Sequence, residues 1–296
     1  MRILVSIDDT DNLTTKGIKG TGDLAKGIAK AIESHGWGTS LRISRHQLLL
    51  HDDIPYTSHN SSMCFEADIT DHHLQAVIDF SSDYLHRESE RGSDPGLCVV
   101  TIEGLSRPQE LIRFGYMAKQ QVLTKELAYG LAHKLSIYLS EHGGSGQGVI
   151  GALAGAGLRL GGNDGSFKGK HKVGEPGEKL TVSELCALAR VDLLQSLDGQ
   201  PINSYDTVVL GTTIKSILSE GKAVIPVQRT ETEDGSPVWT TCSKDLILQI
   251  RTAGCPSFRP DVEEEMVSDE LNSCCNCYFR RWTADSFICM AAAADA

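Results

Sequence analysis

The sequence lacks several features that would assign it to a specialised class of protein. No apolar run is long enough to span a bilayer, and the opening stretch MRILVSID meets a charge too early for a signal peptide. We therefore expect a cytoplasmic protein that makes no contact with a membrane.

An excess of basic residues is absent as well. The formal net charge is −11 and the pI is near 5.4, which argues against a surface built broadly to coat nucleic acid. RNA binding is not excluded by this balance, because a local basic groove can sit on an acidic body.

The nine cysteines do not show the paired pattern of a disulfide framework. Their number is odd, and reduced thiols are the default state in a cytoplasmic chain of this size. Cys274 and Cys277 have the C-x₂-C spacing of a zinc ligand pair, but a zinc ribbon needs a second such pair, and Cys255 and Cys289 each stand alone. Buried thiols are therefore favoured over a zinc site.

The composition is otherwise that of an ordinary soluble globular protein, with 40% hydrophobic and 23% charged residues. A chain of 296 residues is long for a single core, so we expect more than one domain. The predicted division is a first region at 1–165, a glycine-rich loop and helix at 166–203, and a smaller β-rich domain at 204–296.

The predicted elements of the first region follow the order strand, helix, strand, strand, helix, strand. Apolar runs or strict alternation predict the strands, and apolar residues at helical spacing predict the helices. We expect strands at 2–8, 41–50, 63–69 and 97–102, and helices from Thr21 to near Gly36 and over 74–85. This is the split βαβ order of ferredoxin-like folds, and it predicts an α/β (α+β) fold class.

The later segments give more varied signals. A stripe of Leu127, Leu131, Leu135 and Tyr138 predicts a helix over 127–141. The glycine-rich stretch 161–178, with Lys168, Lys170 and Lys172, fits a solvated loop or linker, or a lid that closes over phosphates. A capping box at 181–184 predicts another helix, and short β-prone runs from 204 onwards predict a small sandwich or barrel.

The turn after the first strand concentrates carboxylates. Asp8, Asp9 and Asp11 follow a short apolar run, and the glycine-bracketed Thr21 then opens the first helix as its predicted N-cap. Hard oxygen ligands can hold Mg²⁺ while the amides of a glycine-rich loop and a helix N-terminus face a phosphate. The crowded charges are explained more easily if a cation lies among them. The alternative is an Asx-turn or a capping cluster on the surface.

A second glycine-rich stretch, Gly146-Gln147-Gly148-Val149-Ile150-Gly151, matches G-x-G-x-x-G. A dinucleotide-binding fold needs a strand immediately before this motif, and the predicted helix over 127–141 stands there instead. Two interpretations remain: a loop that cradles phosphate and opens a short helix, or glycines that permit close packing of the alanine-rich segment behind them.

The segment 54–62, between two predicted strands, is dense in small hydrogen-bonding side chains. Loops of this composition usually turn the chain. The functional alternative is that Tyr56, His59 and Asn60 bind a substrate.

Four motifs, in this order and at these intervals, resemble the archaeal isoleucine-tRNA 2-agmatinylcytidine synthetase family. They are Ile7-Asp8-Asp9-Thr10-Asp11, Ile54-Pro55-Tyr56, Asp94-Pro95-Gly96-Leu97 and Gly148-Val149-Ile150-Gly151-Ala152-Leu153-Ala154. Together they cover about residues 1–160. That family uses ATP to activate a tRNA cytidine, which agmatine then modifies, and it pairs a kinase-like domain with a ferredoxin-like one.

The resemblance implies roles for individual residues of this sequence. Asp8, Asp9 and Asp11 would hold Mg²⁺ and the phosphates of ATP, and Thr21 falls on the threonine that becomes phosphorylated. The residues expected to bind the nucleotide are Thr10, Gly20, Gly22, Gly146, Gly148 and Gly151.

The sequence also departs from the family. Its segment Pro55 to Asn60 carries no arginine at the place where the family has one, and His59 cannot grip phosphate or a base bidentately as a guanidinium does. The OB and zinc-ribbon domains with which the family holds tRNA are not recognisable.

The sequence thus predicts an ATP- and Mg²⁺-dependent enzyme of the phosphoryl-transfer or ligase type, whose acceptor is a tRNA cytidine or a small molecule. Asp8 and Asp11 are the expected metal holders, and Asp9 is either a third ligand or the base that orients the nucleophile. Thr21 either accepts phosphate transiently or caps its helix. The alternative is a nucleotide-sensing module that has kept the pocket and lost the chemistry.

Overall fold

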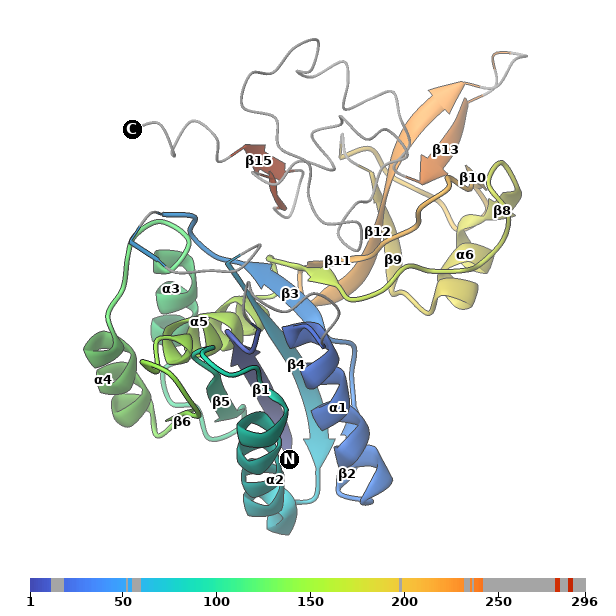
Figure 1. The fold of residues 1–296 in the computed structure, drawn as a ribbon. Coiled ribbons are helices and arrows are strands. Elements are labelled where there is room, and N and C mark those ends of the chain that lie inside the picture. The colour runs from blue at the N-terminus through green and yellow to red at the C-terminus, as the bar shows by residue number, and fades with distance from the viewer. Residues whose placement is uncertain are drawn as a thin grey trace. The chain divides into compact units, whose positions relative to one another are not determined.

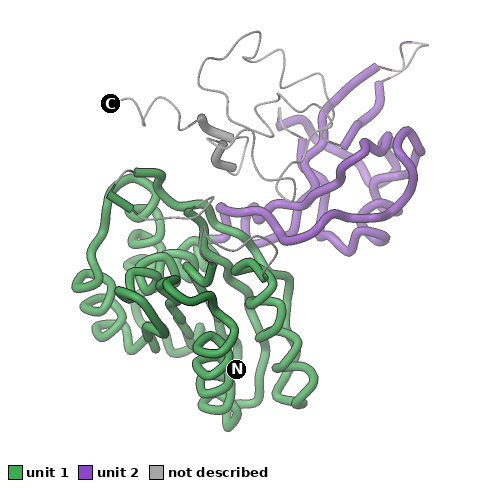
Figure 2. Tube along the Cα trace, viewed as in Figure 1, with its two compact units in different colours: residues 1–161 green, residues 162–296 purple. Residues whose placement is uncertain are grey.

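The computed structural model divides the chain into two compact units, residues 1–161 and 162–296 (Figure 2). It describes residues 1–11, 19–51, 53–54, 60–196, 199–231, 235 and 237–241, together with the backbone of 280–282 and 287–289. Within these residues, no helix has both the length and the apolar character that crossing a membrane requires.

The first unit is built on an antiparallel sheet with the order β6-β5-β1-β4-β3, and β2 pairs with the same edge of β4 as β3 does, further along that strand (Figure 1). The strands are β1 (Arg2–Asp8), β2 (Gly38–Ser40), β3 (Ser44–Gln47), β4 (Ser61–Ile69), β5 (Gly96–Thr101) and β6 (Tyr138–Glu141). The helices are α1 (Thr21–Ser34), α2 (Leu74–Glu88), α3 (Pro108–Met117), α4 (Lys125–Leu135) and α5 (Gly148–Gly161), with the short 3₁₀ helix η1 (Asp71–His73) before α2. The order β5-β1-β4-β3, with helical crossovers α1 and α2, confirms the predicted ferredoxin-like arrangement and the α+β class.

Both faces of this sheet are covered, and β1 contributes to both cores. Ile3, Val5 and Ile7 pack with residues of α1 and α2, whereas Leu4 belongs to the core formed with α3, α4 and α5. Successive side chains of a strand point to opposite faces, so Asp8 shares the α5 side with Leu4. The apolar run that predicts the strand is therefore continuous because the strand is buried on two sides.

The structure corrects the predicted helix over 127–141. Helix α4 ends at Leu135 because Ser136 adopts the left-handed conformation, with φ of 55°, and Tyr138 lies in strand β6. Leu127, the first residue of the predicted stripe, is 54% exposed. A strand does precede the G-x-G-x-x-G motif, but it pairs antiparallel with β5, so the parallel βαβ unit of a dinucleotide fold is still missing. The predicted strand at 41–50 is also shorter, since β3 spans four residues.

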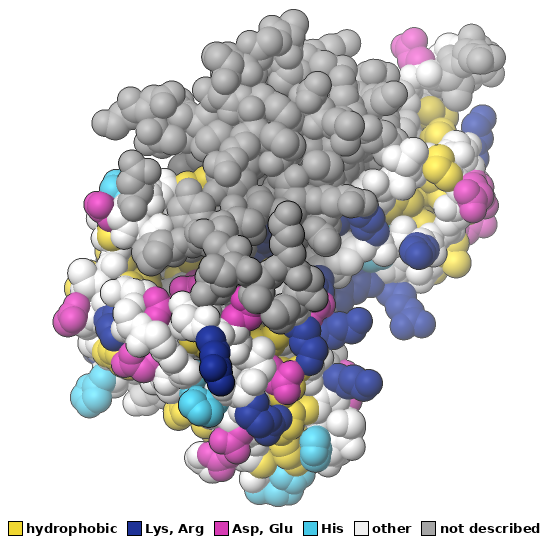
Figure 3. All heavy atoms as spheres, in the orientation of Figure 1, with side chains coloured by type: hydrophobic (Ala, Val, Ile, Leu, Met, Phe, Trp, Pro, Cys, Tyr) yellow, Lys and Arg dark blue, Asp and Glu magenta, His cyan; other side chains and the backbone are white. Residues whose placement is uncertain are grey.

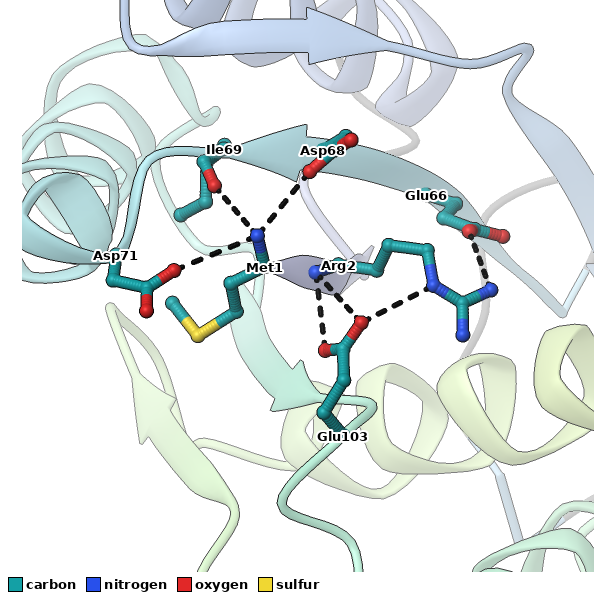
Figure 4. A network of polar contacts seen from close by, with 7 residues as sticks. All are labelled: Met1, Arg2, Glu66, Asp68, Ile69, Asp71 and Glu103. Carbon is teal, nitrogen blue, oxygen red and sulfur yellow. Dashed lines mark hydrogen bonds and ion pairs between the residues drawn. The ribbon is translucent and has the colours of Figure 1, made fainter.

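The N-terminal end of β1 is held by charged contacts (Figure 4). The α-amino group of Met1 lies 3.3 Å from Asp68 and 3.5 Å from Asp71, and these carboxylates raise its pKa. Arg2 pairs with Glu66 on β4 and with Glu103 after β5. These exposed pairs tie β1 to both neighbouring strands at the end opposite Asp8.

The second unit combines helix α6 (Val182–Ala189) with short strands. The strands are β7 (Ser166–Phe167), β8 (Lys179–Thr181), β9 (Leu193–Ser196), β10 (Thr207–Val209), β11 (Ile217–Ser219), β12 (Lys222–Glu231) and β13 (Pro237–Thr241), and a separate pair is formed by β14 (Arg280–Trp282) and β15 (Phe287–Cys289). The order β7-β11-β12-β13-β10-β8, with β9 also on β12, is mixed, because β9–β12 and β10–β13 are parallel. No pairing among the described strands closes the expected sandwich or barrel.

Two local predictions in this unit can be compared with the structure. The capping box is confirmed: Thr181 Oγ1 accepts from the amide of Glu184, and Glu184 accepts from the amide of Thr181. The glycine-rich stretch 161–178 contributes β7, and the amide of His171 donates to Ile214 at 2.8 Å, so this stretch is part of the unit's framework and not a free linker.

Candidate functional site

The acidic corner consists of Asp8, Asp9 and Asp11. It lies at the end of β1, in the connection that leads to α1. Asp8 is 7% exposed, and Asp9 and Asp11 are half-buried. Asp9 turns the chain out of the strand with φ of 52°, a left-handed conformation that Asp tolerates better than most residues. Asp8 is therefore not part of a cluster on the surface, whereas Asp9 and Asp11 remain partly exposed.

Burial governs the protonation of this corner. Desolvation raises the pKa of Asp8 well above its ordinary value, and the charges of Asp9 and Asp11 raise it further. Desolvation also raises the pKa of Asp9 to about 7, with added repulsion from Asp94 and Asp11. Carboxylates in this state gain from a nearby cation, which would offset both the repulsion and the lost hydration.

Helix α1 places its N-terminus beside these carboxylates. A Cβ on Gly20 would lie 3.8 Å from Oδ2 of Asp11, so the Asp11 carboxylate is next to the first turn. The amides of Thr21 and Gly22 open the helix, where no intrahelical carbonyl can accept from them. The amide of Asp23 already donates to Gly20 at 2.8 Å. Anion binding by this helix end would thus use the amides before Asp23.

The structure corrects the predicted role of Thr21 as N-cap. The N-cap is Gly20, which has no side chain that could cap the helix, and Thr21 is the first helical residue. Its hydroxyl instead accepts from Oγ1 of Thr10 at 3.0 Å. Thr10 is 0% exposed and Thr21 8%, so the two hydroxyls form a buried pair next to the acidic corner.

Helix α5 covers the corner from the other side of the sheet. A Cβ on Gly151 would overlap the Asp8 carboxylate, and one on Gly148 would overlap the main chain of Asp94. These two glycines therefore serve close packing of the helix against the ends of β1 and β5. Close packing was one of the two interpretations of the motif.

The loop before α5 already holds an anion, the side chain of Asp94. Its carboxylate accepts hydrogen bonds from the amide of Ser145, from the Ser145 hydroxyl at 2.8 Å and from the amide of Gly146 at 3.2 Å. In this conformation these two amides are occupied by a protein carboxylate. Asp94 appears in the sequence within a recognised motif but carries no predicted role; its place at the start of β5, next to the end of β1, is what brings it to the site.

Of the other predicted residues, some are described and some lie outside the described part of the chain. Asn60 donates to the carbonyl of Leu49 at 2.6 Å, which fixes the chain at the end of the loop. Tyr56 and His59 are outside the described residues, as are Cys255, Cys274 and Cys277. Lys168, Lys170 and Lys172 are exposed side chains of the second unit.

The donor set of the corner fits a small hard cation. Among the described residues, no three His, Cys, Asp or Glu side chains are arranged to hold a metal ion by themselves. Mg²⁺ does not require such a cage, because it keeps several waters and uses one or two carboxylates together with phosphate oxygens. Asp8 and Asp11 supply two carboxylates of this kind, whose charges act on one another.

Comparison with known proteins gives matches among solved structures. No family model matches the sequence, and no curated protein matches it. The chain is similar to the crystal structure of apo TiaS, an agmatidine synthetase for an isoleucine tRNA, with 26% identity and a TM-score of 0.46 over 55% of this chain and 37% of that one. The complex of TiaS with its tRNA and ATP matches with the same identity and TM-score over 55% of this chain and 38% of that one.

A third structure, a tRNA fluorescent labeling enzyme, matches with 25% identity and a TM-score of 0.47 over 62% of this chain and 42% of that one. The chain thus spans less than half the length of the solved structures that it matches. It is similar to part of the isoleucine-tRNA agmatidine synthetase, as the ordered sequence motifs predict.

Proposed function

We propose that this chain is an ATP-dependent enzyme that transfers a phosphoryl or adenylyl group, with Mg²⁺ bound at the acidic corner. The observation that carries this proposal is the burial of Asp8 with Asp9 and Asp11 beside the N-terminus of α1. Crowding like charges in a desolvated site is costly without a partner, and a divalent cation with a polyphosphate is the partner that fits both the carboxylates and the helix end.

The carboxylates of the acidic corner and the first amides of α1 have separate roles in the proposed reaction. Asp8 and Asp11 would hold the cation, which would screen the charge of the phosphates. The amides of Thr21 and Gly22 face the phosphate oxygens. Asp9 is the carboxylate of the corner that is left to accept a proton from the attacking group.

The hydroxyl of Thr21 is the candidate transient acceptor. Thr21 is not the N-cap of its helix, and its hydroxyl accepts a hydrogen bond from Thr10, the residue between Asp9 and Asp11. The sequence resemblance supports a tRNA cytidine as the final acceptor, and a small molecule is the competing choice.

Substitution of Asp8 tests the proposal. We expect Asp8→Asn to abolish Mg²⁺-dependent consumption of γ-labelled ATP, since losing a metal ligand in the transition state raises the barrier by about 3–4 kcal/mol, a rate loss of 10²–10³-fold. Asp79→Asn, an exposed carboxylate on α2, is the matched control and leaves the rate unchanged. Mass analysis of Thr21 after incubation with and without bulk tRNA shows whether it carries the phosphate.

Two outcomes would contradict the enzyme hypothesis. Unchanged ATP consumption in Asp8→Asn would mean that the corner is not the site. Tight binding of Mg²⁺ and ATP by the unsubstituted protein without any turnover would instead support the nucleotide-sensing module.

A further inference from the structure

Asp94 is bonded more extensively than a turn residue needs. It precedes β5, and its side chain accepts three hydrogen bonds from Ser145 and Gly146, while its main-chain oxygen accepts from the amide of Gly148 at 3.1 Å. Four donors from one short stretch of chain thus converge on a single residue. Hydrogen bonds to a charged acceptor are stronger than those between neutral groups.

The same loop is held from its other side by α4. Lys125 Nζ donates to the carbonyl of Ser145 at 2.6 Å and lies 3.1 Å from Glu141. Gly146 has φ of 76°, and a Cβ there would overlap the Glu141 carboxylate, so only glycine fits between these groups. The loop is therefore clamped between Lys125 and Asp94.

The position of this loop determines where α5 begins, and α5 in turn bounds the Asp8 carboxylate. Gly148 starts the helix against the main chain of Asp94 and Gly96, and one turn later Gly151 lies directly against Asp8. A shift of Gly148 would also move Gly151 relative to the Asp8 carboxylate, because both glycines belong to the first turn of α5. Asp94 also lies close enough to Asp9 for its charge to act on it.

We propose that Asp94 is a positioning residue, which fixes the start of α5 and thereby the place of the Asp8 carboxylate in the acidic corner. This inference rests on the proposed function for its catalytic consequence, whereas its structural part stands on the contacts of Asp94 alone. Asp94 does not touch the phosphates or the cation in this role.

The test compares Asp94→Ala, Asp94→Asn and Ser145→Ala with the unsubstituted protein and with the control Asp79→Ala. Asparagine keeps one acceptor oxygen for the loop amides, and Ser145→Ala removes a single hydrogen bond. The three variants therefore remove different numbers of the hydrogen bonds between residue 94 and the loop. The readouts are amide hydrogen exchange of residues 145–152 and the Mg²⁺ concentration that gives half-maximal ATP consumption.

We expect Asp94→Ala to speed exchange of these amides by about tenfold or more and to raise the half-maximal Mg²⁺ concentration by about tenfold, as loss of hydrogen bonds to a charged group implies. The KM for ATP at saturating Mg²⁺ changes less than about threefold. Asp94→Asn recovers part of both effects, and Ser145→Ala shows the smallest change. If Asp94→Ala does not fold, the exchange rates and Mg²⁺ requirements of Asp94→Asn and Ser145→Ala, each compared with Asp79→Ala, test the proposal instead.

Unchanged exchange in the Asp94 variants would overturn the proposal, and so would faster exchange with an unchanged Mg²⁺ requirement. Absence of Mg²⁺-dependent ATP consumption in the unsubstituted protein would refute the proposed function instead. In that case the hydrogen-exchange result alone supports or overturns the positioning of α5 by Asp94.

Discussion

At the scale of single residues, burial sets the chemistry of the acidic corner more than the charges do. Desolvation is the largest cause of the raised pKa of both Asp8 and Asp9, and the neighbouring carboxylates add to it. The sequence shows that three carboxylates are close together, but it does not show which of them loses its water. In the structure Asp8 is the most buried of the three, and α5 packs directly against its carboxylate.

The raised pKa of Asp9 predicts a pH dependence of stability. Because the folded protein binds this proton more tightly than the unfolded chain does, the free energy of unfolding falls as the pH rises from near 3.8 towards about 7 and levels off above that value. Asp9→Asn removes this contribution without straining the left-handed backbone, which Asn also tolerates. Urea unfolding of both proteins between pH 5 and pH 8, without divalent cations, measures it.

We expect the substituted protein to gain stability relative to the unsubstituted one as the pH rises, by at most about 1.4 kcal/mol per pH unit. Parallel stability curves for the two proteins would show that Asp9 does not titrate differently on folding. Mg²⁺ should stabilise the unsubstituted protein more at pH 8 than at pH 5, because the ionised corner is the form that binds a cation.

The buried pair of Thr10 and Thr21 predicts a coupled effect on stability. Thr21→Val leaves the Thr10 hydroxyl without its acceptor in a buried site, which costs about 1–3 kcal/mol, and Thr10→Val removes the donor. The double variant removes both partners and should cost less than the sum of the single ones. A double-mutant cycle by urea unfolding gives the coupling energy, and additive effects would rule out the hydrogen bond.

At the scale of elements, hydrophobic periodicity predicts the order of strands and helices in the first region but not every boundary between them. The strand, helix and strand order of the first region follows from hydrophobic periodicity, because each element buries a regular face. The end of α4 and the presence of β6 do not follow, since apolar residues continue past Leu135 and only the left-handed Ser136 and pairing with β5 separate the two. The clamp on Asp94 depends on contacts between segments about fifty residues apart, which no local pattern records.

The two kinds of helical glycine predict opposite effects of alanine. Gly151→Ala would press a methyl group into the Asp8 carboxylate and should destabilise the protein by about 1–3 kcal/mol while lowering ATP consumption. Gly130→Ala on α4 meets no atom within 4 Å and should stabilise the protein by about 1 kcal/mol, with activity unchanged. Thermal unfolding and ATP consumption of both variants test this contrast, and a stabilised, active Gly151→Ala protein would contradict the packing of α5 on Asp8.

At the scale of the whole molecule, the charge balance bears on the acceptor. The chain carries a net charge of −11, and acidic and basic side chains are interspersed on the face of the first unit seen in Figure 3. Long-range attraction of a polyanion by the protein as a whole is therefore not expected. Binding of tRNA would have to rely on local contacts between lysine or arginine side chains and individual phosphates.

The dependence of acceptor binding on salt separates the two choices of acceptor. Each phosphate neutralised by the protein releases condensed counterions, so binding of tRNA through about five phosphates should weaken with a log–log slope of about −3.5 to −4.5. A small uncharged acceptor releases none, and its affinity should stay nearly constant over the same range. Fluorescence anisotropy of labelled bulk tRNA between 50 and 300 mM KCl measures the slope.

An RNA hairpin of equal length is the control for non-specific binding, because it shows the same slope at lower affinity if the protein recognises tRNA. A slope near zero, or no binding at the lowest salt concentration, would exclude tRNA and leave the small molecule as the acceptor.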